Sequence, residues 1–167
     1  IIGHSERATA YCESDENIAQ KFVQAKKHGL TPILCVGETL IEREAGVMEM
    51  VVAKQLDTII KMHGAEVFID TVVSYEPIWA IGTGLAATPA QAKSMHQFIR
   101  NKMSTLNTEA ANRLKILYGG SVNSQNAVQL FAVSNIDGGL IGRCSLNAQE
   151  FEGICHAAEL STSLVSS

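Results

Sequence analysis

A carboxylate and a histidine each follow an apolar run in this sequence, at positions where strands of a sheet would end. Glu76 follows the β-rich run 71–75, and Pro77 then ends the strand because proline has no backbone N–H to donate. His4 follows an apolar pair in the segment Gly-His-Ser-Glu-Arg. A carboxylate at the end of a strand can act as a base, so Glu76 is a candidate general base and His4 is a second candidate for a functional side chain.

These residues also have ordinary structural interpretations. A glutamate at a strand end is usually a solvated carboxylate, a single histidine is usually structural, and a glycine-rich turn usually only joins a strand to a helix. The segment after Glu76 favours function, because Gly82-Thr83-Gly84 is too flexible for core packing and suited to folding over a ligand. The other four histidines fall on predicted helices or helix ends, and we expect them at the surface: His28, His63, His96 and His156.

Hydrophobic periodicity predicts strands and helices that alternate along the whole chain. The predicted strands are 32–36, 71–75, 115–118 and 136–141, with Ile1 and Ile2 as the end of an earlier one. The predicted helix starts are Ser14 or Asp15, Thr88 with Pro89 and Gln91, and Asn123, and a last helix covers about 148–160. Such alternation is typical of a parallel sheet with outer helices, which carries its functional residues at the carboxyl ends of the strands.

Composition excludes several classes of protein. The 167 residues are 46% hydrophobic and 18% charged, as expected for a globular domain with a sizeable core. A net charge of −4 without a Lys/Arg cluster argues against nucleic-acid or membrane partners. The four cysteines form no CxxC pair, which predicts reduced thiols, a cytoplasmic location and no zinc site. No apolar run is long enough for a membrane span, and no secretion signal is expected.

Five motifs, in this order, resemble the triosephosphate isomerase family. They are Ile1 to Arg7, Cys35-Val36-Gly37-Glu38-Thr39, Tyr75 to Gly84, Tyr118 to Asn123, and Asp137 to Ser145. The resemblance runs from residue 1 to about Leu160. It implies an α/β fold that is part of a (β/α)8 barrel, with about five βα units where a whole barrel of about 250 residues has eight. We expect one incomplete domain over 1–160 and a polar tail over 161–167.

The same resemblance implies an activity and a set of site residues. The family interconverts glyceraldehyde 3-phosphate and dihydroxyacetone phosphate, as a homodimer and without cofactor or metal. Glu76 would be the base and His4, as a neutral imidazole, the electrophile. The expected phosphate contacts are Gly82, Ser121, Gly142 and Arg143. The expected supporting and lid residues are Ser5, Glu6, Cys35, Pro77, Ile78, Trp79 and Tyr118.

The sequence also departs from the family pattern. The first three βα units and the lysine of the first strand have no counterpart here, Ala8 replaces an arginine, and Arg143 replaces a glycine. Because a missing cation near a dianionic substrate removes a large electrostatic effect, we expect this chain alone to be inactive. One alternative is a non-catalytic barrel segment that folds only with a complementary chain. Another, a different phosphate-binding barrel enzyme, would not be expected to keep the whole of 75–84.

Overall fold

The computed structural model of the protein describes residues 1–81, 83 and 85–165, with side chains described as far as residue 161. Its centre is a parallel sheet of three strands, in the order β1 (Ile33–Val36), β2 (Val72–Tyr75) and β3 (Lys115–Tyr118). The last residues of the three strands, Val36, Tyr75 and Tyr118, are in register. The α/β class and the parallel sheet are therefore confirmed, and the segments after the strands leave the sheet at one edge.

The segments outside these three strands pair through single bridges. Ile2 bridges Leu34 of β1, and Gly139 bridges Tyr118 of β3. The prediction of a full strand over 136–141 is therefore wrong. Within the described residues this segment has a pairing neighbour on one side only, and Gly138 has a φ of 149°, which interrupts regular strand geometry. Five extended segments nevertheless lie in sequence order across the sheet.

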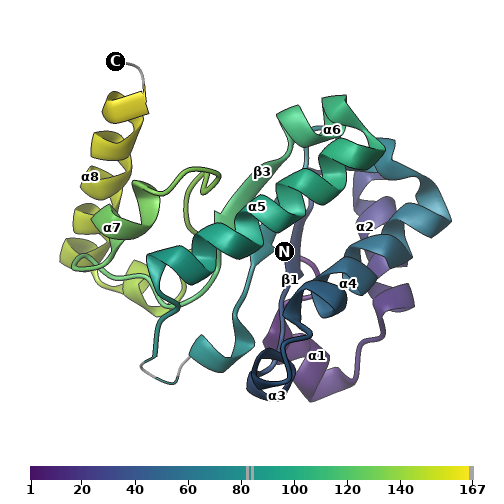
Figure 1. The fold of residues 1–167 in the computed structure, drawn as a ribbon, viewed down its shortest axis with the longest axis horizontal. Coiled ribbons are helices and arrows are strands. Elements are labelled where there is room, and N and C mark those ends of the chain that lie inside the picture. The colour runs from purple at the N-terminus through teal and green to yellow at the C-terminus, as the bar shows by residue number, and fades with distance from the viewer. Residues whose placement is uncertain (82, 84, 166–167) are drawn as a thin grey trace.

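The helices pack beside the sheet, and the predicted strict alternation with strands is wrong because short helices intervene. The long helices are α2 (Asp15–Lys27), α4 (Met48–His63), α5 (Pro89–Leu106) and α8 (Ala148–Val165). The short ones are α1 (Ser5–Tyr11), α3 (Leu40–Glu44), α6 (Thr108–Arg113) and α7 (Ala127–Phe131), with 3-10 turns η1 (Ala65–Phe68), η2 (Ile78–Ala80) and η3 (Arg143–Leu146). Figure 1 shows α1 to α4 at one end of the molecule and α7 with α8 at the other. Throughout the described ranges, every helix is too short or too polar to span a bilayer.

Two of the predicted helix caps are confirmed and one is wrong. Ser14 caps α2, and Thr88 forms a reciprocal capping box with Gln91 at the start of α5. The Asn123 side chain instead accepts hydrogen bonds from the N–H groups of residues 125 and 126, in a turn that precedes α7. At the other end of the chain, α8 continues to Val165, so most of the predicted tail over 161–167 is helical.

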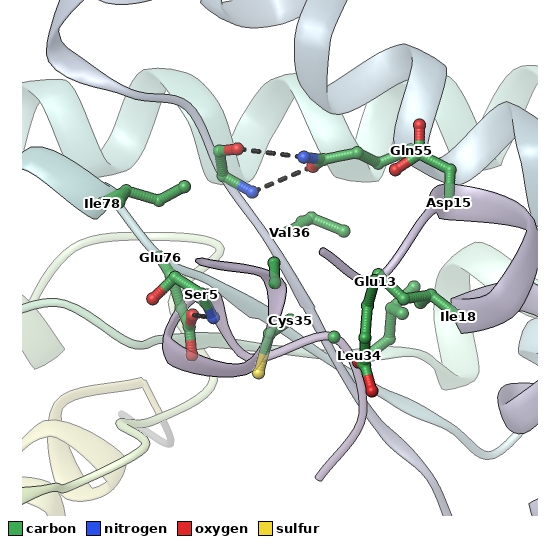
Figure 2. A pocket seen from close by; sticks show the side chains of 13 residues that line it. Ser5, Glu13, Asp15, Ile18, Leu34, Cys35, Val36, Gln55, Glu76 and Ile78 are labelled. Atoms are coloured by element: carbon green, nitrogen blue, oxygen red, sulfur yellow. Dashed lines mark hydrogen bonds between the residues drawn. The ribbon is translucent and has the colours of Figure 1, made fainter. Parts of the chain in front are cut away.

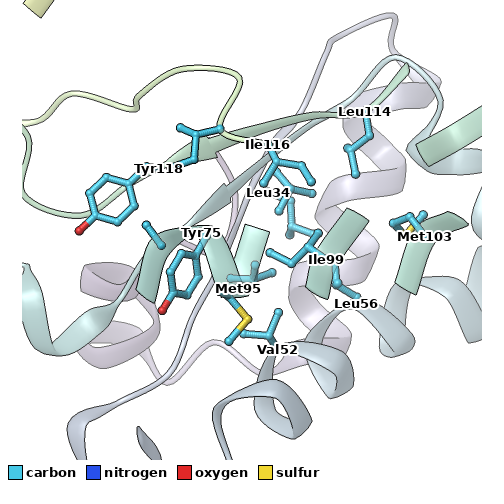
Figure 3. Close-up of a cluster of buried hydrophobic side chains, with 14 of the residues drawn as sticks. Leu34, Val52, Leu56, Tyr75, Met95, Ile99, Met103, Leu114, Ile116 and Tyr118 are labelled. Carbon is cyan, nitrogen blue, oxygen red and sulfur yellow. The ribbon is translucent and has the colours of Figure 1, made fainter. Parts of the chain in front are cut away.

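The core lies between the sheet and the helices α4 and α5 (Figure 3). Its buried side chains come from the sheet and from both helices: Leu34, Tyr75, Ile116 and Tyr118 from the sheet, Val52 and Leu56 from α4, and Met95, Ile99 and Met103 from α5. Each fully buried aliphatic side chain contributes about 1.5–3 kcal/mol to the stability of the fold. This packing holds the carboxyl ends of the three strands in place. His96 of α5 is also completely buried, contrary to the surface position predicted for it.

Candidate active site

Glu76 lies directly after β2 and is almost completely buried, with 2% of its surface exposed. Its Oε2 accepts a hydrogen bond of 3.3 Å from the backbone N–H of Ser5. Its Oε1 is buried and has no hydrogen-bond partner among the described residues. A buried carboxylate oxygen without a partner is costly, and such atoms concentrate where a protein needs a reactive group. The solvated carboxylate considered from the sequence is therefore not what the chain forms.

His4 faces that unpaired oxygen. It is the N-cap residue of α1, and its Nδ1 accepts a hydrogen bond of 3.3 Å from the backbone N–H of Glu6. Because Nδ1 is the acceptor, the proton of a neutral ring is on Nε2. Nε2 lies 3.5 Å from Glu76 Oε1, longer than a usual hydrogen bond. The Nε2–H of His4 and the carboxylate of Glu76 therefore face each other but are too far apart for a good hydrogen bond.

The surroundings of Glu76 favour its protonated form. Burial raises the pKa of this carboxyl group, whereas hydrogen bonding from the Cys35 thiol, the nearby His4 and the Ser5 amide act in the opposite direction. Burial also raises the pKa of the Cys35 thiol, with the charge of Glu76 adding to the effect. Cys35 is therefore a neutral thiol beside the carboxylate, consistent with the supporting position predicted for it.

Gly37, the residue after β1, allows Glu76 to lie where it does. A Cβ on Gly37 would be 1.7 Å from the backbone oxygen of Glu76. Gln55 of α4 fixes this close approach, because its side-chain amide accepts from the Gly37 N–H at 3.0 Å and donates to the Gly37 carbonyl at 3.1 Å. Gly37 at the end of β1 therefore contacts both Glu76 at the end of β2 and Gln55 of α4.

We predict that Gly37→Ala destabilises the fold and displaces Glu76. The overlap is with backbone atoms, which cannot rotate away, so relief requires the two strand ends to separate. The expected loss is about 1–3 kcal/mol, measured by denaturant unfolding. Gly46→Ala is the control for replacing a glycine, since a Cβ there meets no atom within 4 Å, although its positive φ of 72° adds strain of its own. A Gly37→Ala chain no less stable than the Gly46→Ala chain would contradict the prediction.

The segment after Glu76 is tied to a second buried carboxylate, Glu38. Glu38 is fully buried, and its Oε1 accepts from Tyr75 Oη at 3.0 Å, Trp79 Nε1 at 2.9 Å and Arg43 Nη1 at 3.0 Å. The Arg43 guanidinium also lies 5.0 Å from the centre of the Trp79 ring. The Glu38 carbonyl accepts from the Ile78 N–H at 3.1 Å. Ile78 and Trp79, which the sequence predicts as lid residues, are therefore held by the segment after β1.

The far end of the same segment is fixed by Tyr118. Its hydroxyl accepts a hydrogen bond of 3.2 Å from the buried backbone N–H of Ala87. The loop after Tyr118 also approaches the start of the segment, because a Cβ on Gly120 would be 3.0 Å from Pro77 Cγ. Both ends of the segment 77–87 thus contact β3 or the loop that follows it. Gly82, predicted to contact phosphate from the middle of this segment, lies outside the described residues.

The other residues predicted to contact phosphate differ in how near their segments lie to Glu76. Ser121 lies in the loop after β3, and this loop approaches Glu76 at Gly119, where a Cβ would be 2.8 Å from Glu76 Cγ. Asn126 fixes this loop by donating to the Ser121 carbonyl at 3.0 Å. Arg143 is the first residue of η3 and Gly142 precedes it. Both are exposed, and Arg143 forms no ion pair with the described part of the chain. The structure thus places the start of the loop that carries Ser121 beside Glu76, but among the described residues it shows no contact of Ser121 or Arg143 with Glu76.

A small cavity opens beside Glu76 (Figure 2). Its volume is about 80 Å³, and its lining includes Ser5, Cys35, Gly37, Glu76 and Ile78. Pockets that hold small molecules usually measure about 300 Å³ or more. His4 does not line this cavity, so a ligand that touched both His4 and Glu76 would lie largely outside it. The described residues bring His4 and Glu76 together but form no pocket that encloses both.

Three residues of this arrangement were not predicted from the sequence: Arg43, Gln55 and Tyr75. The charged turn over 38–44 gave a signal for Arg43, because a buried Glu38 needs cationic or hydrogen-bonding partners. Gln55 gave none, since nothing in helical periodicity shows that one polar residue of α4 bonds the backbone at the end of β1. Glu6, predicted as a supporting side chain, contributes its backbone N–H, and its side chain is exposed.

Known proteins resemble this chain over nearly its whole length. The family model described as Triosephosphate isomerase matches residues 1–158. The protein named Triosephosphate isomerase from Pseudomonas entomophila (strain L48) is 52% identical over 158 residues, covering 95% of this chain and 63% of that protein. The protein of the same name from Escherichia coli O1:K1 / APEC is 54% identical over 159 residues, covering 95% and 62%. The chain spans less than two thirds of these relatives, and it belongs to the triosephosphate isomerase family.

Proposed function

We propose that the protein carrying this chain is a triosephosphate isomerase, which interconverts D-glyceraldehyde 3-phosphate and dihydroxyacetone phosphate. The observation that carries the proposal is the unpaired, buried Oε1 of Glu76, which faces the protonated Nε2 of His4 at 3.5 Å. As in the family, we propose a homodimer that acts in the cytoplasm, in glycolysis and gluconeogenesis. The test is isomerase turnover by the protein at its natural length, and an inactive natural protein would overturn the proposal.

The reaction needs one base and one hydrogen-bond donor. Glu76 takes a proton from the carbon next to the carbonyl, and the electrons of the broken C–H bond form the C=C bond of an enediolate. His4 Nε2–H donates to the oxygen on which negative charge develops. Glu76, now protonated, returns the proton to the neighbouring carbon, while the hydroxyl proton on the first carbon moves to the former carbonyl oxygen and a C=O bond forms at the first carbon. The burial that raises the pKa of Glu76 makes its carboxylate a stronger base than an exposed glutamate.

The phosphate is proposed to bind at the loop after β3 and the segment that starts η3. The Ser121 N–H donates to no acceptor among the described residues, so it is available to an anion. Gly142 with Arg143, and Gly82 from the lid, complete the proposed contacts. Arg143 is exposed, and its guanidinium would add a positive charge where the family pattern has a glycine.

We predict that the 167-residue chain alone shows no isomerase turnover. The cavity of about 80 Å³ beside Glu76 is too small to enclose a triose phosphate, and the chain contains only about 62–64% of the length of its relatives. A water-exposed enediolate would lose phosphate before the proton returned. The measurement is a coupled assay of the purified chain in both directions. Turnover above the buffer control, lost in Glu76→Gln, would contradict this prediction.

A non-catalytic barrel segment is the second candidate. Several large apolar side chains are exposed, among them Leu146 at 88%, Ile41 at 79% and Ile1 at 69%. Exposed apolar surface and an open sheet edge favour pairing with another chain. Light scattering of the purified chain separates the two candidates together with the turnover assay. A natural protein of this length that associates and shows no turnover would favour the second candidate.

A further inference from the structure

His96 of α5 occupies a completely buried position between two tyrosines of the sheet. Its ring meets the Tyr75 ring edge-on, with ring centres 5.9 Å apart and planes at 88°. It also lies 6.5 Å from the Tyr118 ring, at 35°. The two tyrosine rings are themselves 6.5 Å apart. The imidazole is therefore the third member of a ring cluster that joins β2, β3 and α5.

The orientation of the His96 ring is fixed from the opposite side. Nδ1 lies 3.0 Å from the carbonyl oxygen of Asn135, which can only accept, so Nδ1 carries the proton. The Asn135 side chain in turn donates to Gln97 of α5 at 2.6 Å. Nε2 is buried and has no partner among the described residues. His96 is therefore hydrogen-bonded through Nδ1 alone, and its other contacts are those of its ring with the two tyrosines.

The two tyrosines that touch His96 fix opposite ends of the segment 77–87. The Tyr75 hydroxyl bonds Glu38 Oε1, the same oxygen that accepts from Trp79 Nε1 near the start of the segment. The Tyr118 hydroxyl accepts from the Ala87 N–H at its end. A displacement of either ring would change one of these anchors. A displacement of His96 leaves a void beside both rings and would change the two anchors together.

We propose that His96 is a positioning residue that sets both tyrosine rings, and through them both ends of the segment that follows the base. The inference rests on the proposed function only in treating 77–87 as a catalytic lid. His96 touches no reacting atom in this scheme. Its effect passes through the hydroxyl groups of Tyr75 and Tyr118.

The test compares two variants that separate the ring of His96 from its hydrogen bond. His96→Asn keeps a donor for the Asn135 carbonyl but removes the ring, and His96→Phe keeps a ring but removes the donor. Met103→Ala is the control, because Met103 is equally buried in α5 but lies away from both tyrosines (Figure 3). Hydrogen exchange is followed at the Ala87 amide and the Trp79 indole N–H, relative to the buried Leu56 amide as a monitor of global unfolding.

We expect His96→Asn to speed exchange at both Ala87 and Trp79 by about tenfold beyond any change at Leu56. In His96→Phe and Met103→Ala, exchange at the two anchors should follow Leu56. If His96→Asn does not fold, retained protection at both anchors in His96→Phe supports the inference and its loss overturns it. A change at one anchor only, or none beyond the control, also overturns it. The readout needs no turnover, so an inactive protein would refute the proposed function and leave this result intact.

Discussion

Replacing Glu76 with glutamine is expected to lower isomerase turnover of the natural-length protein by a factor of about 10²–10⁴, the usual contribution of a general base. Glutamine has nearly the shape of glutamate and its oxygen can still accept from the Ser5 N–H, so the loss should reside in kcat rather than in substrate binding. The measurement is steady-state kinetics in both directions. A loss smaller than about tenfold would show that another group removes the proton.

The same substitution should stabilise the fold at pH 7. Burial raises the pKa of Glu76, so the folded chain favours the protonated form and stability decreases as the pH rises above the ordinary carboxyl range. A neutral glutamine does not carry the free-energy cost of burying a charge. The gain in stability over the wild-type chain should become smaller at low pH, where the wild-type carboxyl group is itself protonated. Glu44→Gln is the matched control, because Glu44 is exposed at the end of α3 and lies outside the site. Equal melting temperatures for the two variants would contradict the argument.

Acidification is expected to destabilise the chain through His96. Burial lowers the pKa of His96 from 6.5 to about 4, with the charge of Arg100 acting in the same direction and the Asn135 carbonyl and Asp137 opposing it. Between these pH values the unfolded chain binds a proton that the folded chain excludes. Stability should therefore fall by about 3 kcal/mol as the pH drops from 6.5 to 4, and this contribution should be constant below that.

The measurement is denaturant unfolding from pH 7 to 4, for the wild-type chain and for His96→Phe. Carboxyl groups titrate in the same range, but they do so in both chains, so the difference between the two curves isolates His96. The other ionisable groups in contact with the imidazole, Tyr75 and Tyr118, stay protonated, because burial raises the pKa of each. Parallel curves would mean that His96 contributes nothing to the acid sensitivity.

The sequence predicted the central elements well because they carry local signals. The range 115–118 matches β3 residue for residue, and the Thr88 capping box is the pattern expected from Thr-Pro-Ala-Gln. The range 136–141 carried the same apolar signal as a strand, but pairing depends on neighbours, and only β3 lies beside it in the described residues. Short helices such as α1 and α3 were missed because one or two turns give too little periodicity.

The candidate site was predictable where residue type and position coincide, as for Glu76 and His4. It was not predictable where the contacts of a side chain depend on how the helices pack on the sheet. His96 lies on the face of α5 that the spacing of Ala92 and Ile99 marks as apolar, so its burial had a local signal that was overlooked. Its contacts with Tyr75 and Tyr118 had none. Gln55 is likewise a polar residue of a helix, and its partner is the backbone of Gly37 at the end of β1. Such contacts depend on tertiary packing, which a single sequence does not report.

The single oxygen of Glu38 that serves three donors has a consequence for how this family can vary. Tyr75, Trp79 and Arg43 share one acceptor oxygen, so the loss of one donor changes the position of that oxygen and the strength of its other two hydrogen bonds. The effects of substituting these residues should not add. Over evolutionary time the four positions are expected to co-vary, with viable lineages exchanging them in combination and rarely one at a time.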